Sequence, residues 1–372
     1  MQDGNRVDRN PGLQAMRGIA ALLVFFQHAF NQSALFQAGP EQTLYKLSLG
    51  GIGVYCFFVL SSFLISTKAS DPPGRFLLDR ARRLFPGLWL AILLAWALDY
   101  LTTQYHVPTW QLFLLLPFGE QPKAAMPYWT LYYEVLLYLV IFVLARLSPR
   151  VVAPGILAWG LVAWWLLPPE PLAGHLFPDL RQLFLSTVAG AFGAGILVRW
   201  HAERPIRPAW RIPVMTLITV LAVVSLATLM ILGLIPQYDF LYGWTAQLVP
   251  DPLQHSLGML YLVVGSALAV RAAVMWKANG WMGRVLRRVG DMSYGLYLIH
   301  IAFLVTFRHL LLVNGITMNF WTALLVLTLL ALPCSLAFGW VEFRMQTWIK
   351  NLLRPRSRTE IVIPRAAEPV MP

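Results

Sequence analysis

The chain has 372 residues, of which 58% are hydrophobic and 12% are charged, and its mean hydropathy is +0.61. This composition is typical of a polytopic membrane protein and excludes an ordinary soluble globular domain. The net charge of +12 is scattered over short connections without a binding motif, so nucleic-acid binding is not expected. Cys56 and Cys334 both fall in apolar runs, which does not indicate a disulfide framework.

The hydropathy pattern predicts an all-α, polytopic membrane protein with about ten transmembrane helices. The predicted spans are about residues 13–30, 49–67, 86–104, 127–146, 151–167, 182–200, 213–235, 256–275, 291–312 and 320–343.

Basic residues alternate between the connections of these spans. Every Lys and Arg except Lys46, Lys123, Arg181 and Arg308 falls on one side. By the positive-inside rule this side is the cytoplasm, so we expect both termini there. We expect residues 1–345 to form one membrane domain. Residues 346–372, rich in Pro and charge, are expected to be a disordered cytoplasmic tail.

The first span carries Arg17 and His28, two ionisable residues that are rare inside a membrane helix. They are eleven positions apart in the sequence, so they share one helix face and lie about 16 Å apart along the axis. With Arg17 at one interface, His28 lies near the middle of the bilayer. Such a residue usually marks a functional site, and the alternative is a histidine that only hydrogen-bonds to a neighbouring helix.

Other polar residues fall near the same depth when they are counted from the ends of their spans. They are Ser61 and Ser62 in the second span, Glu134 in the fourth and His300 in the ninth. Glu134 is the only carboxylate well inside any predicted span. We therefore expect one polar layer shared by four spans. The structural alternatives are a charge partner for Glu134, packing for His300 and hydrogen bonds of the serines to their own helix.

Arg80, Arg82 and Arg83 precede the third span. They either anchor the topology or bind a polyanion at the inner surface.

These motifs and their order resemble those of the membrane acyltransferase-3 family, particularly its members in bacterial exopolysaccharide and O-antigen modification. The resemblance covers about residues 1–345. It is carried by Arg17 and His28 with ten residues between them, the segment 53–65, the segment 80–86, the segment 129–134 and the segment 293–300.

The chain also departs from the family pattern at three places. Gln14 and Ala15 stand where many members have Asp, Ser62 replaces a usual glycine, and no proline follows Glu342 closely.

The resemblance implies a multi-pass protein of the inner (plasma) membrane that takes an acyl group, most simply acetyl, from cytoplasmic acyl-CoA. The acceptor is then a hydroxyl of a polysaccharide or lipid-linked oligosaccharide outside, with no tightly bound cofactor and no metal. In this scheme Arg17, Arg80, Arg82 and Arg83 hold acyl-CoA, and His28 acts as general base with help from Glu134 and Arg17. The remaining candidates for binding substrate or stabilising an oxyanion are Ser61, Ser62, Trp129, Ser293, Tyr297 and His300.

Two other functions compete with this one. In a proton-coupled secondary transporter, His28, Glu134 and His300 form a proton relay. A structural subunit of an export complex would not need His28. For the enzyme we expect one water-accessible cavity, open on both sides, whose two openings meet at His28 and allow direct transfer. The alternative is an acyl-enzyme on His28 or a serine.

Overall fold

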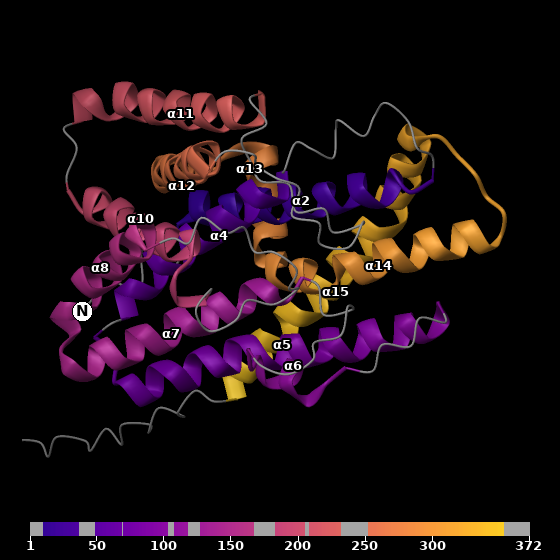
Figure 1. Ribbon diagram of the computed structural model, residues 1–372, viewed down its shortest axis with the longest axis horizontal. Coiled ribbons are helices and arrows are strands. Elements are labelled where there is room, and N and C mark those ends of the chain that lie inside the picture. The colour runs from indigo at the N-terminus through magenta and orange to yellow at the C-terminus, as the bar shows by residue number, and fades with distance from the viewer. Residues whose placement is uncertain are drawn as a thin grey trace, which may run out of the picture.

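The computed structural model describes residues 10–36, 49–68, 70–102, 108–117, 127–166, 183–204, 208–231 and 252–352. Over these ranges the protein is all-α and has no β-strand, as predicted (Figure 1). The α-helices are α2 (Pro11–Ser33), α4 (Leu49–Ile65), α5 (Pro73–Leu101), α6 (Trp110–Leu114), α7 (Trp129–Leu147), α8 (Val152–Trp165), α10 (Thr187–Ala202), α11 (Pro208–Ile231), α12 (Pro252–Met275), α13 (Gly280–Asp291), α14 (Ser293–Val313) and α15 (Phe320–Leu352).

Each of the ten predicted spans overlaps one of these helices, but the number that can cross a bilayer is smaller by length and composition. Among the described residues, five helices qualify: α2, α5, α7, α14 and α15. Residues Met259–Met275 of α12 and helix α13 make a sixth if this pair, bent by 118°, counts as one span. The described residues thus support a polytopic membrane protein and do not establish the count of ten.

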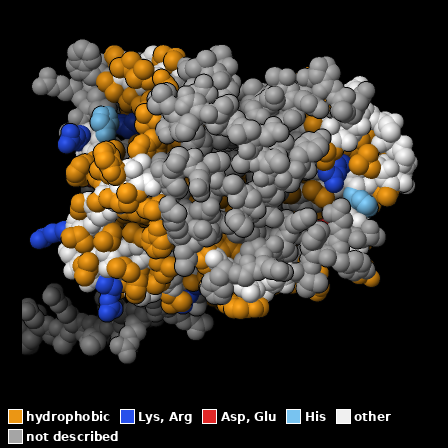
Figure 2. Space-filling view, in the orientation of Figure 1, with side chains coloured by type: hydrophobic (Ala, Val, Ile, Leu, Met, Phe, Trp, Pro, Cys, Tyr) orange, Lys and Arg blue, Asp and Glu red, His pale blue; other side chains and the backbone are white. Residues whose placement is uncertain are grey.

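Apolar side chains cover much of the outer surface of the bundle. Leu93 of α5, Leu161 of α8 and Leu329 of α15 are all largely exposed. Figure 2 shows apolar side chains over the left part of one face and several Lys and Arg side chains along the left edge. A broad exposed apolar surface bordered by basic residues fits a bundle embedded in lipid.

Two boundaries differ from the prediction for the same physical reason. Helix α5 begins at Pro73, well before the predicted start at 86, so Arg80, Arg82 and Arg83 lie on a helix and Pro86 lies inside it. The segment Gly280–Asp291, predicted as a connection, is helix α13. Both stretches are too polar for a hydropathy scan, because each carries several arginines and an aspartate.

The last helix also runs further than the hydropathy indicates. Helix α15 passes the expected domain boundary at 345 and ends at Leu352, while residues 353–372 lie outside the described ranges. Glu342, inside this helix, is only 3% exposed. The interpretation that Glu134 is the only carboxylate well inside a span was therefore wrong.

Helix α2 packs against α4, α13 and α14 and holds the centre of the arrangement (Figure 1). Its contact with α13 depends on a glycine, because a methyl group at Gly290 would overlap the carbonyl oxygen of Gln14. This close approach places the start of α14, which directly follows α13, beside the Arg17 end of α2.

Candidate active site

The beginning of α2 is held firmly, which positions Arg17. The Asn10 side-chain oxygen accepts hydrogen bonds from the backbone N–H groups of Gly12 (2.9 Å) and Leu13 (3.2 Å), and Pro11 occupies the first helical position. The Asn10 amide donates to the carbonyl oxygen of Val274, 2.9 Å away on α12. These bonds tie the first turn of α2 to the rest of the bundle.

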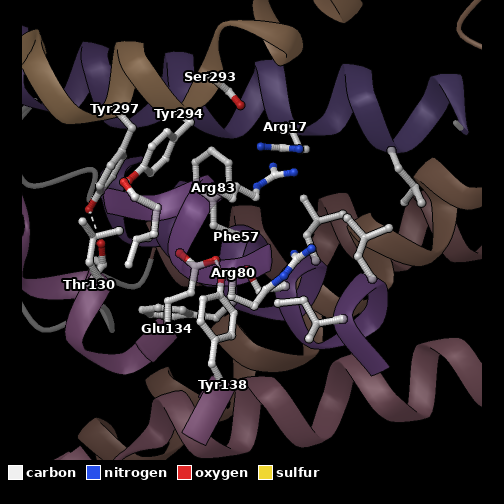
Figure 3. Close-up of a pocket in the computed structure, with 18 of the residues that line it drawn as sticks. Arg17, Phe57, Arg80, Arg83, Thr130, Glu134, Tyr138, Ser293, Tyr294 and Tyr297 are labelled. Carbon is white, nitrogen blue, oxygen red and sulfur yellow. Dashed lines mark hydrogen bonds between the residues drawn. The ribbon is translucent and has the colours of Figure 1, made fainter. Parts of the chain in front are cut away.

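A cavity of about 340 Å³ opens at this end, between α2, α4, α5, α7 and α14. Five cationic side chains line it: Arg17, Lys68, Arg80, Arg83 and Lys350. Figure 3 shows Arg17, Arg80 and Arg83 directed into the cavity from different sides. The Nε atom of Arg80 is buried and has no hydrogen-bond partner among the described residues. This concentration of cations suits a polyanionic ligand.

One acidic group faces these cations. Glu134 of α7 lines the same cavity and accepts a short hydrogen bond from the Tyr138 hydroxyl, one turn further along α7. Tyr294 of α14 also lines the cavity, and its hydroxyl donates to the carbonyl oxygen of Leu84 at 2.7 Å. Glu134 therefore belongs to the basic pocket, where it offsets part of the positive charge.

Tyr297 and Phe57 both line the cavity, and Figure 3 shows Tyr297 on the side away from the arginines and Phe57 nearer to Arg83. Their rings lie edge to face, 6.0 Å apart. The Tyr297 hydroxyl donates to the carbonyl oxygen of Pro127 at 3.0 Å, and the Thr130 hydroxyl lies 2.7 Å from it (Figure 3). Because a carbonyl only accepts, the Tyr297 proton points to Pro127 and Thr130 donates to Tyr297. Tyr297 thus has no free O–H for an oxyanion in this arrangement.

A pair of histidines lies beyond Tyr297. His300 follows Tyr297 by one turn of α14, and its ring is 5.9 Å from the Tyr297 ring. His300 is fully buried, and its Nε2 atom is 3.1 Å from Nδ1 of His28 on α2, which is partly exposed.

The surrounding carbonyl groups determine the tautomers of this pair. Nδ1 of His300 lies 2.8 Å from the carbonyl oxygen of Tyr297 and 3.2 Å from that of Leu296, so it carries the proton. Nε2 of neutral His300 is then an acceptor, and His28 donates to it from Nδ1. The carbonyl oxygen of Val24, 2.9 Å from the same His28 atom, fits this assignment. Nε2 of His28 is left with the lone pair of a general base.

The prediction of one polar layer shared by four spans was wrong, because the register of α7 against α14 separates Glu134 from the histidines. The helices run in opposite directions and are joined by the hydrogen bond from Thr130 to Tyr297. From that level Glu134 lies about 6 Å towards the arginines, and His300 lies about 4.5 Å the other way. The prediction failed because hydropathy places the ends of membrane spans too inaccurately for side chains on different helices to be ranked by their depth in the bilayer.

The predicted site residues divide into two groups. Those that line the cavity are Arg17, Ser61, Arg80, Arg83, Glu134, Ser293 and Tyr297. Those that do not are His28, Ser62, Arg82, Trp129 and His300. This cavity therefore stops short of His28 and does not by itself form the expected common opening at His28.

Three residues of the second group have other contacts. The Arg82 guanidinium lies 3.6 Å from the Asp79 carboxylate on the surface of α5. The Ser62 hydroxyl bonds to the carbonyl oxygen of Val59 and packs against Gly195 of α10, which leaves room for it. The ring of Trp129 packs edge to face on Tyr133.

Ser293 and Ser61 remain as hydroxyls of the cavity wall. The Ser293 oxygen is buried and has no hydrogen-bond partner among the described residues, and Figure 3 shows it near Arg17. It is therefore a candidate for a ligand contact.

Several residues of the site were not singled out from the sequence. Asp291 at the end of α13 accepts a 2.7 Å hydrogen bond from the Gln14 amide, so it supplies a carboxylate near the position where Gln14 and Ala15 replace an acid. Glu342 lies between α5 and α14, next to Gly87 and Gly295. The sequence did single out Glu342 in one respect, because this acidic residue directly follows a long uncharged stretch of α15.

The fold and the pocket together define a helical membrane protein with a strongly basic cavity and, next to it, a pair of hydrogen-bonded histidines. The profile of the acyltransferase-3 family, described as an acyltransferase domain, matches residues 10–340, and the chain belongs to this family. It is also similar to the exopolysaccharide production protein ExoZ of Rhizobium meliloti (strain 1021), with 45% identity over 60 residues. That match covers 15% of this chain and 19% of ExoZ. No solved structure matches the chain significantly.

Proposed function

We propose that this acyltransferase moves an acyl group, most simply acetyl, from acyl-CoA to a hydroxyl of an extracytoplasmic or lipid-linked glycan. The observation that carries the proposal is the joint arrangement of two features. Five cations surround one cavity, and the end of this cavity leads through Tyr297 to a histidine whose Nε2 is free to take a proton. The similarity of a short segment to an exopolysaccharide production protein supports a glycan as the acceptor.

The cavity fits the donor by charge. The phosphates of coenzyme A would bind between Arg17, Arg80 and Arg83, whose guanidinium groups form charge-assisted hydrogen bonds with phosphate oxygens. Under the positive-inside rule this end faces the cytoplasm, where acyl-CoA is made. The pantetheine arm would extend along α14 towards Tyr297 and bring the thioester near the histidine pair.

The reaction follows from the tautomer of His28. Its Nε2 takes the proton of the acceptor hydroxyl as the hydroxyl oxygen attacks the thioester carbonyl carbon. The carbon–sulfur bond then breaks, and the leaving thiolate takes the proton back from Nε2. The products are the ester and free coenzyme A. Throughout, the bond from His28 Nδ1 to His300 keeps the ring oriented and holds the positive charge that forms on it.

In this scheme Phe57 and Tyr297 form a barrier, because they line the cavity that would hold the thioester while His28 lies outside it. Direct transfer therefore requires this barrier to open. We propose that arrival of the donor breaks the bonds of Tyr297 to Thr130 and Pro127 and swings the ring aside. A closed barrier also keeps water away from the thioester until then.

The transporter is the less favoured function because its relay would need Glu134 beside the histidines. The register places Glu134 and His300 about 10 Å apart along the helix axes. The test is a purified protein in lipid nanodiscs, which have no ion gradient, with labelled acetyl-CoA and native membrane glycans. Transfer of label to glycan supports the enzyme, and its absence despite donor binding argues against it. Stoichiometric label held on the protein without acceptor would instead show an acyl-enzyme.

A further inference from the structure

Arg308 is a cation within the membrane helices that the proposed reaction does not use. Arg308 lies on α14 beyond the histidine pair, on the side away from the donor cavity. Its Nη1 donates to the Gln32 side-chain oxygen at 2.6 Å, and its Nε is buried without a hydrogen-bond partner among the described residues. Gln32 is 8% exposed and follows His28 by one turn of α2.

Arg308 is directed towards the histidines. Side chains of an α-helix lean towards its N-terminus, so Arg308 points back along α14 in the direction of His300. Its contact with Gln32 places the guanidinium group about one helical turn, roughly 6 Å, beyond the level of His28. The cation therefore lies on the path by which an acceptor would reach His28 from outside.

The charge of Arg308 is not balanced by the helices around it. No Asp or Glu occurs in α2, in α14 or in residues 314–341. An arginine within a membrane span is usually paired or functional, and the plain alternative is a side chain that reaches out to lipid headgroups. The bond to buried Gln32 and the buried Nε hold Arg308 inward and favour a ligand that is anionic.

We propose that Arg308, together with Gln32, binds an anionic group of the acceptor and thereby places the acceptor hydroxyl at His28. The proposal rests on the proposed function, since it needs an acceptor at this histidine. The planar guanidinium group matches the oxygens of a carboxylate or of a phosphate. An acidic sugar would supply the first, and the phosphate link of a lipid-carried glycan would supply the second.

Three probes built on a glucopyranose ring separate these sources: the neutral methyl β-glucoside, the carboxylate methyl β-glucuronide and the phosphate glucose 1-phosphate. Their binding to the full-length protein in nanodiscs is measured with saturating coenzyme A, so that the donor cavity is filled. We expect one charged probe to bind about 10-fold or more tightly than the neutral one, as a charge-assisted hydrogen bond provides. Preference for the glucuronide indicates an acidic sugar, and preference for glucose 1-phosphate indicates a phosphate link.

Arg308→Gln should abolish this preference, and Arg308→Lys, which keeps the charge, should retain part of it. His309→Gln is the matched control, because His309 is the next residue and points about 100° away around α14. Coenzyme A binding, measured on each variant, reports folding and tests the proposed function separately. The inference is overturned if charged and neutral probes bind alike, or if the preference survives Arg308→Gln.

Discussion

His28 donates a hydrogen bond from Nδ1 to Nε2 of His300, 3.1 Å away, and Nδ1 of His300 is in turn held by the carbonyl oxygen of Tyr297. This chain of bonds makes Nε2 of His28 the proton acceptor of the pair. It also gives His300 a positioning role, which the sequence did not distinguish from packing.

The first prediction tests this positioning role. His300→Leu removes the acceptor for His28 Nδ1, so the ring loses its orientation and kcat should fall about 100-fold. His300→Gln keeps an acceptor oxygen and should restore part of kcat. The KM for acyl-CoA should change little in either variant, because His300 does not line the donor cavity. Equal kcat values for the Leu variant and the wild type would contradict the assignment.

The second prediction separates the three arginines of α5. Arg80→Gln and Arg83→Gln should each raise the KM for acyl-CoA about 10-fold, since each removes a charged hydrogen-bond donor from the cavity. The dependence of this KM on salt should also weaken. Arg82→Gln is the control, because Arg82 pairs with Asp79 outside the cavity and its loss should leave KM nearly unchanged. Equal effects at all three positions would indicate a general surface charge instead.

The third prediction concerns the barrier between donor and base. Tyr297→Phe removes the bonds to Pro127 and Thr130, and Phe57→Ala opens the other half of the barrier. Both variants should hydrolyse acetyl-CoA several-fold faster than the wild type when no acceptor is present, because water then reaches the thioester. Trp129→Phe, next to Thr130 but outside the cavity, serves as the control. Unchanged hydrolysis would show that the barrier does not protect the donor.

The fourth prediction concerns the packing that holds α14 in register. A methyl group at Gly295 would lie 2.6 Å from the Gly339 Cα atom, so Gly295→Ala forces α14 away from α15. Overpacking of this kind costs about 1–3 kcal/mol and should lower the thermal midpoint in nanodiscs. Gly193→Ala is the control, because its nearest neighbour would be 3.8 Å away. A midpoint as high as that of the control would contradict the close packing.

The sequence was sufficient to predict a helical membrane bundle and a rough position for each long helix. Apolar runs report burial in lipid strongly, so α2, α7 and α14 were located to within a few residues. The same scan misplaced the start of α5 and missed α13, because polar helices at the membrane surface lack an apolar run.

The site was predicted in its parts and not in its assembly. The helical period correctly put Arg17 and His28 on α2, but it gave no register between helices. The hydrogen bond from Thr130 to Tyr297 shows the register of α7 against α14, and this register separates Glu134 from His300. The spacing of residues along the sequence does not report a contact between two helices. The burial of Glu342 likewise depends on the packing of α15 against Gly87 of α5 and Gly295 of α14.

The most direct test of the central claim is a paired measurement on His28→Ala in nanodiscs: the affinity for acetyl-CoA and the rate of acetyl transfer to glycan. We predict that the affinity stays within about threefold of the wild type, because His28 lies outside the donor cavity, while transfer falls at least 100-fold. A folded His28→Ala protein that transfers acetyl at the wild-type rate would contradict the claim that His28 is the general base.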